Sequence, residues 1–558
     1  MLLHWSVIPA TNLINSMEVD SLTIAFQGTS ENPERIHASG FSFAGFPWPF
    51  FAILFLSASI SLLWSHCSLL TNDELLELWT DRISSLGQIV HVQLTGPISV
   101  DPILYHAIAH GAIRIFGANP FALRLPSLIG FLMMQVCLFV FVRRLASERA
   151  AVIAMVFPAL TLPFFFSLDG RPYGMMLGLL GVAMVSWQSA ICAEARRLVP
   201  LILLALSLAM ILNTHYSGVL LFAPFCIAEV FRTCQRRRLD LPVATAICMG
   251  GAGIVFALPL MKAALQHRDF YYFPRELLKP PTIIWTYLRL LSPTPQYFFG
   301  GVQMSARSAI VLVILAFALW GFILRWRRRA PPRLDPEMVF LAVLTALPFF
   351  SFLMARFVTH TFEERYSLSM VVGLAAFTGI GMSMHAWGKR TGNLILIAFL
   401  VAIVLFGTRS ILNARSATQE AMSAMTVSPE AKAALMASSS KQFYIQNLQM
   451  FARVSYYEKD PYIRAHLSLV FSREQEIRWH HMDTVSMAAL HMINFTQFNI
   501  VSFETLTTLP GDHLFVVYPE TSSSQFNWIG RALAAAHAEV KPVGHAFGGD
   551  VVSVRFRP

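Results

Sequence analysis

About eleven apolar runs, most of them near 20 residues long, recur along the chain and constrain its fold more than any other feature. A helix of about 20 apolar residues crosses the hydrocarbon core of a bilayer. The sequence therefore predicts an all-α polytopic membrane protein with about eleven transmembrane helices. The expected spans are 44–65, 123–142, 150–168, 173–193, 198–213, 216–231, 243–262, 306–324, 338–355, 367–387 and 393–410.

Composition excludes the common alternatives. Only 13% of the residues are charged, about half the usual share of a soluble domain, which argues against a soluble enzyme or a disordered chain. The six cysteines show no paired spacing, so neither a disulfide framework nor a zinc-thiolate site is expected. The net charge of +10 would suggest nucleic acid in a soluble protein. Here we expect no nucleic acid, because the basic residues gather in alternate short loops.

Those basic loops predict the orientation of the chain. Placing the N-terminus in the cytoplasm makes every even-to-odd connection net positive, as cytoplasmic loops usually are. We then expect residues 1–43 to be a cytoplasmic segment, 44–410 a membrane domain with a long first outer loop at 66–122, and 411–558 an outer domain. Strand-like runs at 443–445, 513–518 and 551–556, with an Ala-rich helical run at 529–539, predict that this outer domain is a small α/β fold.

Two adjacent carboxylates, Asp73 and Glu74, follow the first span at the predicted membrane surface. One interpretation is a catalytic or binding pair, and the other is a helix N-terminus, which favours acids. Farther along the same loop, Asp101 precedes a Pro-led apolar stretch at 102–116. That stretch is short for a span, so we expect a dipping or interfacial helix.

Two more polar clusters, 167–174 and 363–367, are predicted to return to the same face. Each could be a helix cap or an interfacial anchor. Ionisable groups at membrane depth are costly and are usually functional. Together the clusters would surround one outer cavity with carboxylates, arginines and tyrosines, which favours an anionic, lipid-linked substrate.

The order of these motifs resembles the GT-C glycosyltransferases over about residues 44–410. An acidic pair follows span one, then come Asp-Pro-Ile-Leu-Tyr-His at 101–106, Phe-Gly and Arg-Leu-Pro-Ser into span two, Arg-Pro-Tyr at 171–173, and a late Arg-Tyr. The similarity is to bacterial transferases like the protein O-mannosyltransferases, the aminoarabinose transferases of lipid A and the rhizobial core galacturonosyltransferases. Ile103 departs from the pattern, since a second proline is common there. The tail from 411 resembles no family.

The resemblance implies an enzyme that takes a sugar from a polyprenyl phosphate and passes it to an acceptor on the outer face. It assigns Asp73 as the base, with Glu74 as its pair and Asp101 as a second carboxylate of less secure role. The residues that the resemblance and the phosphate chemistry assign to substrate binding are Arg171, Tyr173, Arg365, Tyr366, Tyr105, Arg268, Arg275 and His215.

Some of these assignments have alternatives. Arg268 and Arg275 lie in an aromatic loop that could equally anchor the protein at the interface, and a lone histidine such as His215 is more often structural. The carboxylates Asp73, Glu74 and Asp101 could hold a divalent cation; no other cofactor is expected, since a lipid-phosphate donor needs no nucleotide.

Other classes of protein remain open at the level of sequence. A flippase or transporter would need charges along a midplane path and usually two related halves. An O-antigen polymerase or ligase also uses polyprenyl-linked sugars but carries its large loop late in the chain. A non-enzymatic scaffold would leave the clustered acids unexplained. We therefore expect a transferase of a bacterial inner membrane with a periplasmic C-terminus, acting on a glycan, lipid or protein acceptor.

Overall fold

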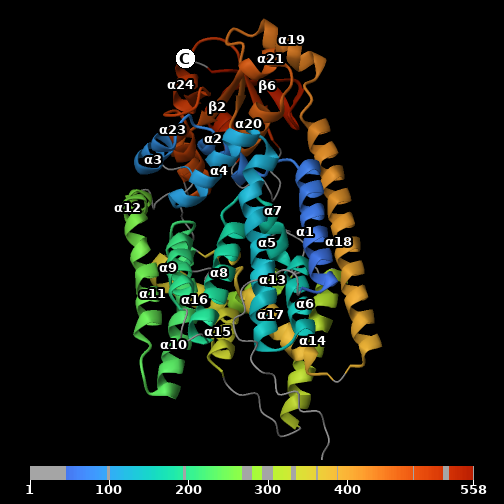
Figure 1. Ribbon diagram of the computed structural model, residues 1–558. Coiled ribbons are helices and arrows are strands. Elements are labelled where there is room, and N and C mark those ends of the chain that lie inside the picture. The colour runs from blue at the N-terminus through green and yellow to red at the C-terminus, as the bar shows by residue number, and fades with distance from the viewer. Residues whose placement is uncertain are drawn as a thin grey trace, which may run out of the picture. The chain divides into compact units, whose positions relative to one another are not determined.

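The computed structural model describes residues 46–96, 98, 101–192, 197–266, 279–291, 306–327, 335–359, 362–385, 387–481, 483–518 and 527–556. In these ranges the chain is mostly helical and ends in a domain built on a six-stranded sheet (Figure 1). Six helical segments are long and apolar enough to cross a membrane. They are α1 (Trp48–Cys67), α5 (Pro120–Leu145), α8 (Tyr173–Cys192), η3 (Tyr216–Leu221) with α10 (Phe222–Arg236), α14 (Ala306–Arg327) and α18 (Lys389–Ala424).

Three further apolar segments are bent, and each bend lies at a Leu-Pro pair: 162–163, 258–259 and 347–348. Proline lacks the N–H of a helical hydrogen bond and its ring clashes with the preceding turn, so a sharp bend at these pairs is expected. In the first, α6 (Glu148–Val156) and η2 (Phe157–Leu160) meet α7 (Leu162–Leu168) at a bend of 66°. In the second, α11 (Leu241–Ala252) and η4 (Gly253–Phe256) meet α12 (Leu258–Gln266) at a bend of 51°. In the third, α15 (Pro336–Thr345) meets α16 (Leu347–Met354) and η7 (Ala355–Thr359) at a bend of 53°.

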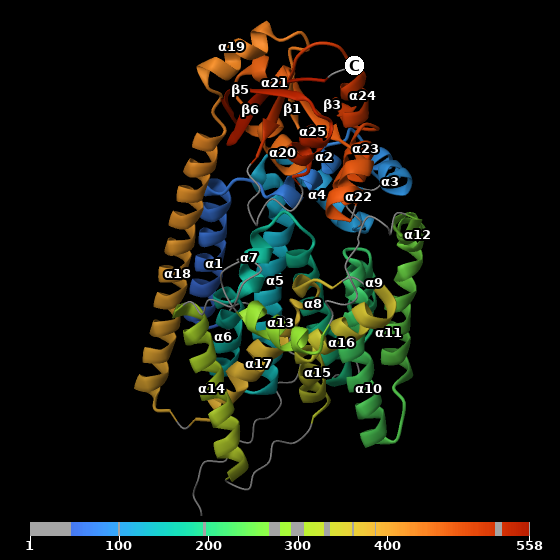
Figure 2. The ribbon, with the colours of Figure 1, turned by 180° about the vertical axis from the view of Figure 1, so that it is seen from behind.

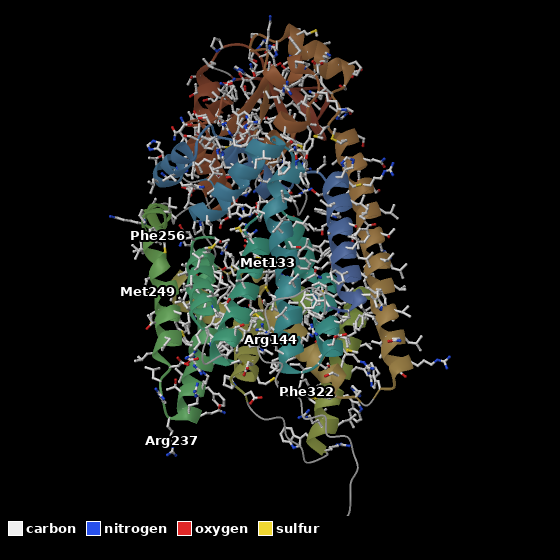
Figure 3. The ribbon with its side chains drawn as sticks, viewed as in Figure 1. Met133, Arg144, Arg237, Met249, Phe256 and Phe322 are labelled. Carbon is white, nitrogen blue, oxygen red and sulfur yellow. The ribbon has the colours of Figure 1, made fainter. Side chains whose placement is uncertain are left out.

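The predicted number of eleven spans is not confirmed. The described residues contain six spanning helices, or up to nine if each bent pair is one span. Two expected spans, α9 (Leu198–Leu212) and α17 (Met370–Ser383), have 15 and 14 residues, or about 22 and 21 Å at 1.5 Å per residue. They are shorter than a hydrocarbon core of about 30 Å. The chain is a multi-pass membrane protein. Large apolar side chains such as Met249 and Phe256 point outward from the helices (Figure 3), where they are 62% and 77% exposed.

The segment between α1 and α5 folds into three helices, α2 (Asn72–Asp81), α3 (Leu86–Thr95) and α4 (Ile103–Phe116). Thr71 caps α2, because its hydroxyl accepts a hydrogen bond from Glu74 N while the Glu74 carboxylate accepts one from Thr71 N, the reciprocal arrangement of a capping box. α4 has 14 residues and is followed by Gly117, whose φ of 85° suits glycine. The helix is shorter than a membrane span, as expected, and its place at the interface stays a prediction.

The C-terminal domain is an α/β fold, as predicted. Its sheet has the strand order β3-β2-β1-β4-β6-β5. The strands β3, β2, β1 and β4 are parallel to one another. The strand β6 is antiparallel to both of its neighbours, β4 and β5. The strands are β1 (Phe443–Ile445), β2 (Leu467–Phe471), β3 (Asn499–Ser502), β4 (His513–Val517), β5 (Glu539–Ala546) and β6 (Gly549–Arg555). The helices are α19 (Pro429–Ala437), α20 (Leu448–Tyr457), α21 (Pro461–Ala465), α22 (Arg473–His480), α23 (Thr484–Met492), α24 (Phe503–Thr508) and α25 (Ile529–Ala535).

The sequence patterns found β1, β4, β6 and the Ala-rich α25 but not the other three strands. The expected start of the outer domain at 411 falls inside α18, which continues to Ala424. In both views of the chain the sheet lies beside α2–α4, at one end of the long helices (Figures 1 and 2).

Hydrogen bonds tie the end of α1 to this domain. Leu70 N donates to Tyr457 Oη of α20 at 2.8 Å. Thr418 of α18 donates its hydroxyl to Cys67 O at 2.8 Å and accepts from Leu69 N at 3.2 Å. The segment that leads from α1 into α2 is therefore held from two sides.

Close approach of α5 to α8 depends on glycine. A Cβ on Gly130 would lie 2.3 Å from Gly174 O, and a Cβ on Gly174 would lie 2.3 Å from Ser127 O. These distances are too short for any side chain, so the two backbones touch directly. This contact sets the position of the first turn of α8, which carries Tyr173.

We expect Gly130→Ala to lower thermal stability, because the added methyl must push α5 and α8 apart. Overpacking of this kind costs about 1–3 kcal/mol. The control is Gly111→Ala in α4, where a Cβ meets nothing within 4 Å and alanine is the better helix former. Thermal unfolding of both variants in detergent checks this; equal melting temperatures would contradict the packing argument.

Candidate active site

Three carboxylates line one face of α2. Asp73, Glu77 and Asp81 are spaced by four residues, which places them above one another on a helix. Glu77 and Asp81 are fully buried, whereas the Asp73 side chain is 49% exposed. Like charges at this spacing repel, so the stripe requires cations beside it.

Those cations come from distant parts of the chain. Arg365 Nη1, from η8 (Glu364–Ser367), lies 3.1 Å from Asp73 Oδ2. Arg171, in the turn between α7 and α8, contacts Glu77 Oε1 through Nη1 at 2.6 Å and Asp101 Oδ2 through Nη2 at 3.4 Å. Arg171 thus joins α2 to the segment before α4.

His215 and two tyrosines complete the cluster. His215 Nε2 lies 3.4 Å from Asp101 Oδ1, and its ring centroid is 5.2 Å from Tyr173 and 5.3 Å from Tyr366. The Arg365 guanidinium carbon lies 5.8 Å from the centre of the Tyr173 ring. Seven predicted residues from five separate segments therefore meet at one place. They are Asp73, Asp101, Arg171, Tyr173, His215, Arg365 and Tyr366.

The charge state of His215 follows from its contacts. Burial, together with Arg171 and Arg365, lowers the pKa of His215 to about 4 against the opposing effect of Asp101. The imidazole is therefore neutral near pH 7. Nδ1 accepts a hydrogen bond from Ser217 N at 3.1 Å, so the single ring proton lies on Nε2, which faces Asp101.

The carboxylates of the site are driven to different protonation states. Burial acts to raise the pKa of Asp73, but Arg171 and Arg365 outweigh it, and the net shift is downward. Burial raises the pKa of Glu77 despite Arg171 and His106, and burial with the nearby Glu74 raises that of Asp169. In sites that perform acid–base chemistry, the surroundings usually shift the pKa values of neighbouring carboxylates in opposite directions. Asp73 is the ionised, accessible member.

Three donors of the cluster have no hydrogen-bond partner among the described residues: Arg171 Nε, Arg365 Nε and the hydroxyl of Tyr173. Buried donors ordinarily find an acceptor. Two guanidinium groups and a phenol converge here, and such donors are what a phosphate group requires.

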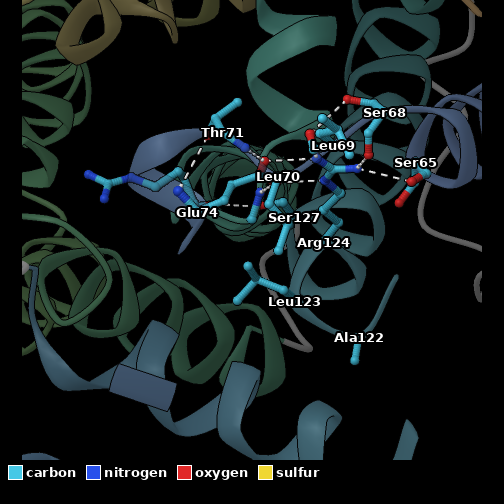
Figure 4. A network of polar contacts seen from close by, with 12 residues as sticks. Ser65, Ser68, Leu69, Leu70, Thr71, Glu74, Ala122, Leu123, Arg124 and Ser127 are labelled. Atoms are coloured by element: carbon cyan, nitrogen blue, oxygen red, sulfur yellow. Dashed lines mark hydrogen bonds and ion pairs between the residues drawn. The ribbon is translucent and has the colours of Figure 1, made fainter. Parts of the chain in front are cut away.

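Glu74, by contrast, is part of the scaffold. Arg124 of α5 contacts both oxygens of Glu74, through Nε at 2.6 Å and Nη2 at 2.8 Å, and also donates to the carbonyls of Ser65, Ser68 and Leu69 (Figure 4). Gly170 N donates to Glu74 Oε1 at 2.7 Å. Both side chains are buried. This geometry corrects the expected catalytic place of Glu74, because its oxygens are taken by structural donors.

Tyr105 also differs from expectation. It is fully buried, and its hydroxyl donates to Leu123 O at 3.1 Å, which fastens α4 to α5 instead of facing the cluster. Arg268 and Arg275 lie outside the described residues. The cation site at Asp73, Glu74 and Asp101 that the sequence left open is not formed by these side chains, since Arg124 binds both oxygens of Glu74.

The group that could hold a metal is a different one. Among the described residues, Glu77, Asp81 and His106 offer ligand atoms within 4.8 Å of one another, and two carboxylate oxygens with one imidazole suit Zn²⁺ or a similar transition metal. All three already have ionisable partners: His106 Nδ1 is 2.7 Å from Asp81 Oδ1, and Arg171 Nη1 is 2.6 Å from Glu77 Oε1.

Sequence reasoning missed Glu77, Asp81, His106 and Asp169. The four-residue spacing of the α2 acids, matched by His106 and His110 on α4, is a signal that could have found three of them. Asp169 lies two residues before Arg171, inside a cluster already recognised as polar.

Comparison with known proteins bears on this geometry. The family described as "Dolichyl-phosphate-mannose-protein mannosyltransferase" matches residues 100–261, a range that includes Asp101, Arg171, Tyr173 and His215 but not Asp73 or Arg365. No curated protein sequence matches the chain.

Two solved structures share the fold. One is ArnT from Cupriavidus metallidurans bound to undecaprenyl phosphate, with 12% identity and a TM-score of 0.51. The other is the same protein in the apo state, with 11% identity and a TM-score of 0.52. Each match covers 90% of this chain and 97% of ArnT. The chain is therefore similar to GT-C glycosyltransferases in part of its sequence and in its fold. The predicted resemblance and the predicted enzyme class, a glycosyltransferase, are confirmed.

We expect Arg124→Met to lower the free energy of unfolding by about 3–5 kcal/mol, because removing one partner leaves the Glu74 charge buried and unpaired. Arg365→Met is the matched control. Its pair with Asp73 is partly exposed, so its loss costs at most about 1 kcal/mol. Thermal or denaturant unfolding in detergent separates the two, and a larger loss for Arg365→Met would contradict the structural role given to Arg124.

Proposed function

We propose that this chain is an integral-membrane glycosyltransferase that moves a sugar from a polyprenyl-phosphate donor to an acceptor hydroxyl on the outer face of the membrane. The observation that carries the proposal is the pairing of an ionised, half-exposed Asp73 with unpartnered donors of Arg171, Arg365 and Tyr173. The undecaprenyl phosphate bound to ArnT, a protein of the same fold, supports a lipid-phosphate donor.

Asp73 acts as the general base. A carboxylate with a lowered pKa is ionised at neutral pH, and half of its side chain remains open to an incoming group. It accepts the proton of the acceptor hydroxyl as that oxygen bonds to the anomeric carbon. The bond from this carbon to the phosphate oxygen breaks, and its electron pair leaves with the lipid phosphate.

The leaving phosphate gathers negative charge, which fixed donors stabilise. Arg171 is held rigidly by Glu77 and Asp101, so its remaining N–H is oriented before the substrate arrives. Arg365 lies between Asp73 and the Tyr173 ring. The neutral His215 keeps a proton on Nε2 toward Asp101 and so fixes the second carboxylate without adding charge.

The outer-face assignment rests on charge and position. The site lies where α1 ends and where α8 and η3 begin, and the basic residues of the expected cytoplasmic loops, such as Arg144 and Arg237, lie toward the other end of these helices (Figure 3). By the positive-inside rule, the site and the C-terminal domain then face the periplasm of a bacterial inner membrane.

Asp73→Asn keeps the shape of the side chain and removes the base, so turnover should fall by about 10²–10⁴-fold. Sugar transfer from a polyprenyl-phosphate donor in proteoliposomes measures this, with melting temperature followed alongside. Glu420→Gln, an exposed carboxylate near the end of α18, should leave turnover unchanged. Turnover near the wild-type level in Asp73→Asn would remove Asp73 from the reaction.

Arg365→Gln should move the acidic limb of the pH–rate profile to higher pH. Arg365 helps to lower the pKa of Asp73; without that cation the carboxylate is protonated, and lost as a base, at a higher pH than in the wild type. Loss of one charge-assisted contact to phosphate should also reduce the rate about tenfold to a hundredfold. Rates compared between pH 4 and 9 test both effects; an unmoved limb would place Arg365 away from the base.

A further inference from the structure

A cavity of about 610 Å³ lies between α2 and the C-terminal domain. Its wall includes Trp79 and Arg82 at the end of α2, Phe451 of α20, Arg464 of α21, and Gln497 and Phe498 just before β3. None of the residues assigned above to catalysis or phosphate binding lines it. Its volume is in the range of cavities that hold small ligands.

One wall of the cavity is an ordered aromatic cluster. The Trp79 and Phe498 rings are 4.7 Å apart at 76°, and the Phe451 and Phe498 rings are 5.0 Å apart at 85°. Trp79 is only 5% exposed, and its indole N–H has no hydrogen-bond partner among the described residues. Such a buried N–H ordinarily has an acceptor.

The charged groups of the cavity are all positive. Its wall contains Arg82 and Arg464 and no carboxylate. Both arginines are exposed, and neither forms an ion pair with a described residue. The Arg82 guanidinium carbon lies 3.4 Å from the centre of the Trp79 ring. Stacking on the ring fixes the orientation of the guanidinium group and leaves the N–H groups at its edge available to an anion.

Aromatic faces, two fixed cations and the side-chain amide of Gln497 together suit a sugar that carries a negative charge. The C–H faces of a sugar ring pack on aromatic rings, its hydroxyls bond to amides, and its carboxylate or phosphate binds guanidinium groups. A purely apolar lipid chain would leave both arginines without a partner.

We propose that this cavity is a binding subsite for an anionic saccharide, the part of the acceptor that lies away from the reacting hydroxyl. The proposal rests on the proposed function, because it assigns the cavity to the acceptor of that reaction. α2 connects the two places: Asp73 and Arg82 are nine residues apart, or about 14 Å along a helix. The acceptor is therefore an oligosaccharide or glycolipid that extends over several sugar units, not a single sugar.

Binding is measured by calorimetry on the full-length protein in detergent without donor, so that no transfer takes place. The probes are a pentagalacturonate, which carries carboxylates, a singly phosphorylated mannopentaose, and the uncharged maltopentaose. At least one charged probe should bind at least tenfold more tightly than maltopentaose, and the tighter one identifies the anionic group. Binding of neither charged probe, or equal binding of the uncharged one, would overturn the proposal.

The double variant Arg82→Ala/Arg464→Ala should weaken binding of the charged probe about tenfold to a hundredfold or more. Both side chains are exposed, so its melting temperature should stay close to that of the wild type. Arg478→Ala is the matched control: Arg478 is an exposed arginine over Trp479, at 5.2 Å, in the same domain but outside the cavity. Equal loss in the control, or no loss in the double variant, would refute the subsite.

The two proposals can fail separately. Asp73→Asn should retain full binding of the charged probe while losing transfer. If the charged probe binds in the cavity but no sugar is transferred from any polyprenyl phosphate, the proposed function falls and the saccharide site remains. If transfer proceeds but the charged probes do not bind, the subsite falls alone.

Discussion

The buried ion pair between Glu74 and Arg124 is the interaction on which the arrangement of the candidate site depends. It joins the end of α1, the first turn of α2, the second long helix α5 and the turn that leads to α8. A buried charge pair adds little stability over an apolar contact, but it tolerates few geometries because every lone pair must find its donor. Fixing α2 in this way fixes Asp73.

The helix α2 also carries three carboxylates on one face. Because these like charges repel one another, each of them needs a cationic partner from another part of the chain. Asp81 is balanced by His106, Glu77 by Arg171, and Asp73 by Arg365. Burial raises the pKa of Glu77 and Asp81, whereas the net shift in the pKa of the half-exposed Asp73 is downward. Asp73 is therefore the one carboxylate of this stripe that is both accessible and held ionised by its neighbours.

Much of this site could be predicted from particular residues. Asp73, Asp101, Arg171, Tyr173, Arg365 and Tyr366 are each conspicuous as polar groups next to long apolar runs, and the structure brings them together. Glu77 and Asp81 were missed although their four-residue spacing from Asp73 is plain in the sequence. Periodicity shows that residues share a face, but it does not show whether that face turns toward solvent, lipid or another helix.

The sequence by itself determined the membrane class, the small α/β domain and the order of the polar motifs, because all of these follow from local composition. The bends at the Leu-Pro pairs were not predicted, although they follow from the backbone chemistry of proline. The resemblance assigned Asp73 as the base and Glu74 as its pair, but only the tertiary structure shows that Arg124 binds Glu74 while Asp73 stays half-exposed. Neighbouring residues on a helix point about 100° apart, and which of the two meets Arg124 depends on where α5 packs. The same holds for Tyr105 and for the aromatic cavity beneath the sheet domain, since both arise from segments far apart in the chain.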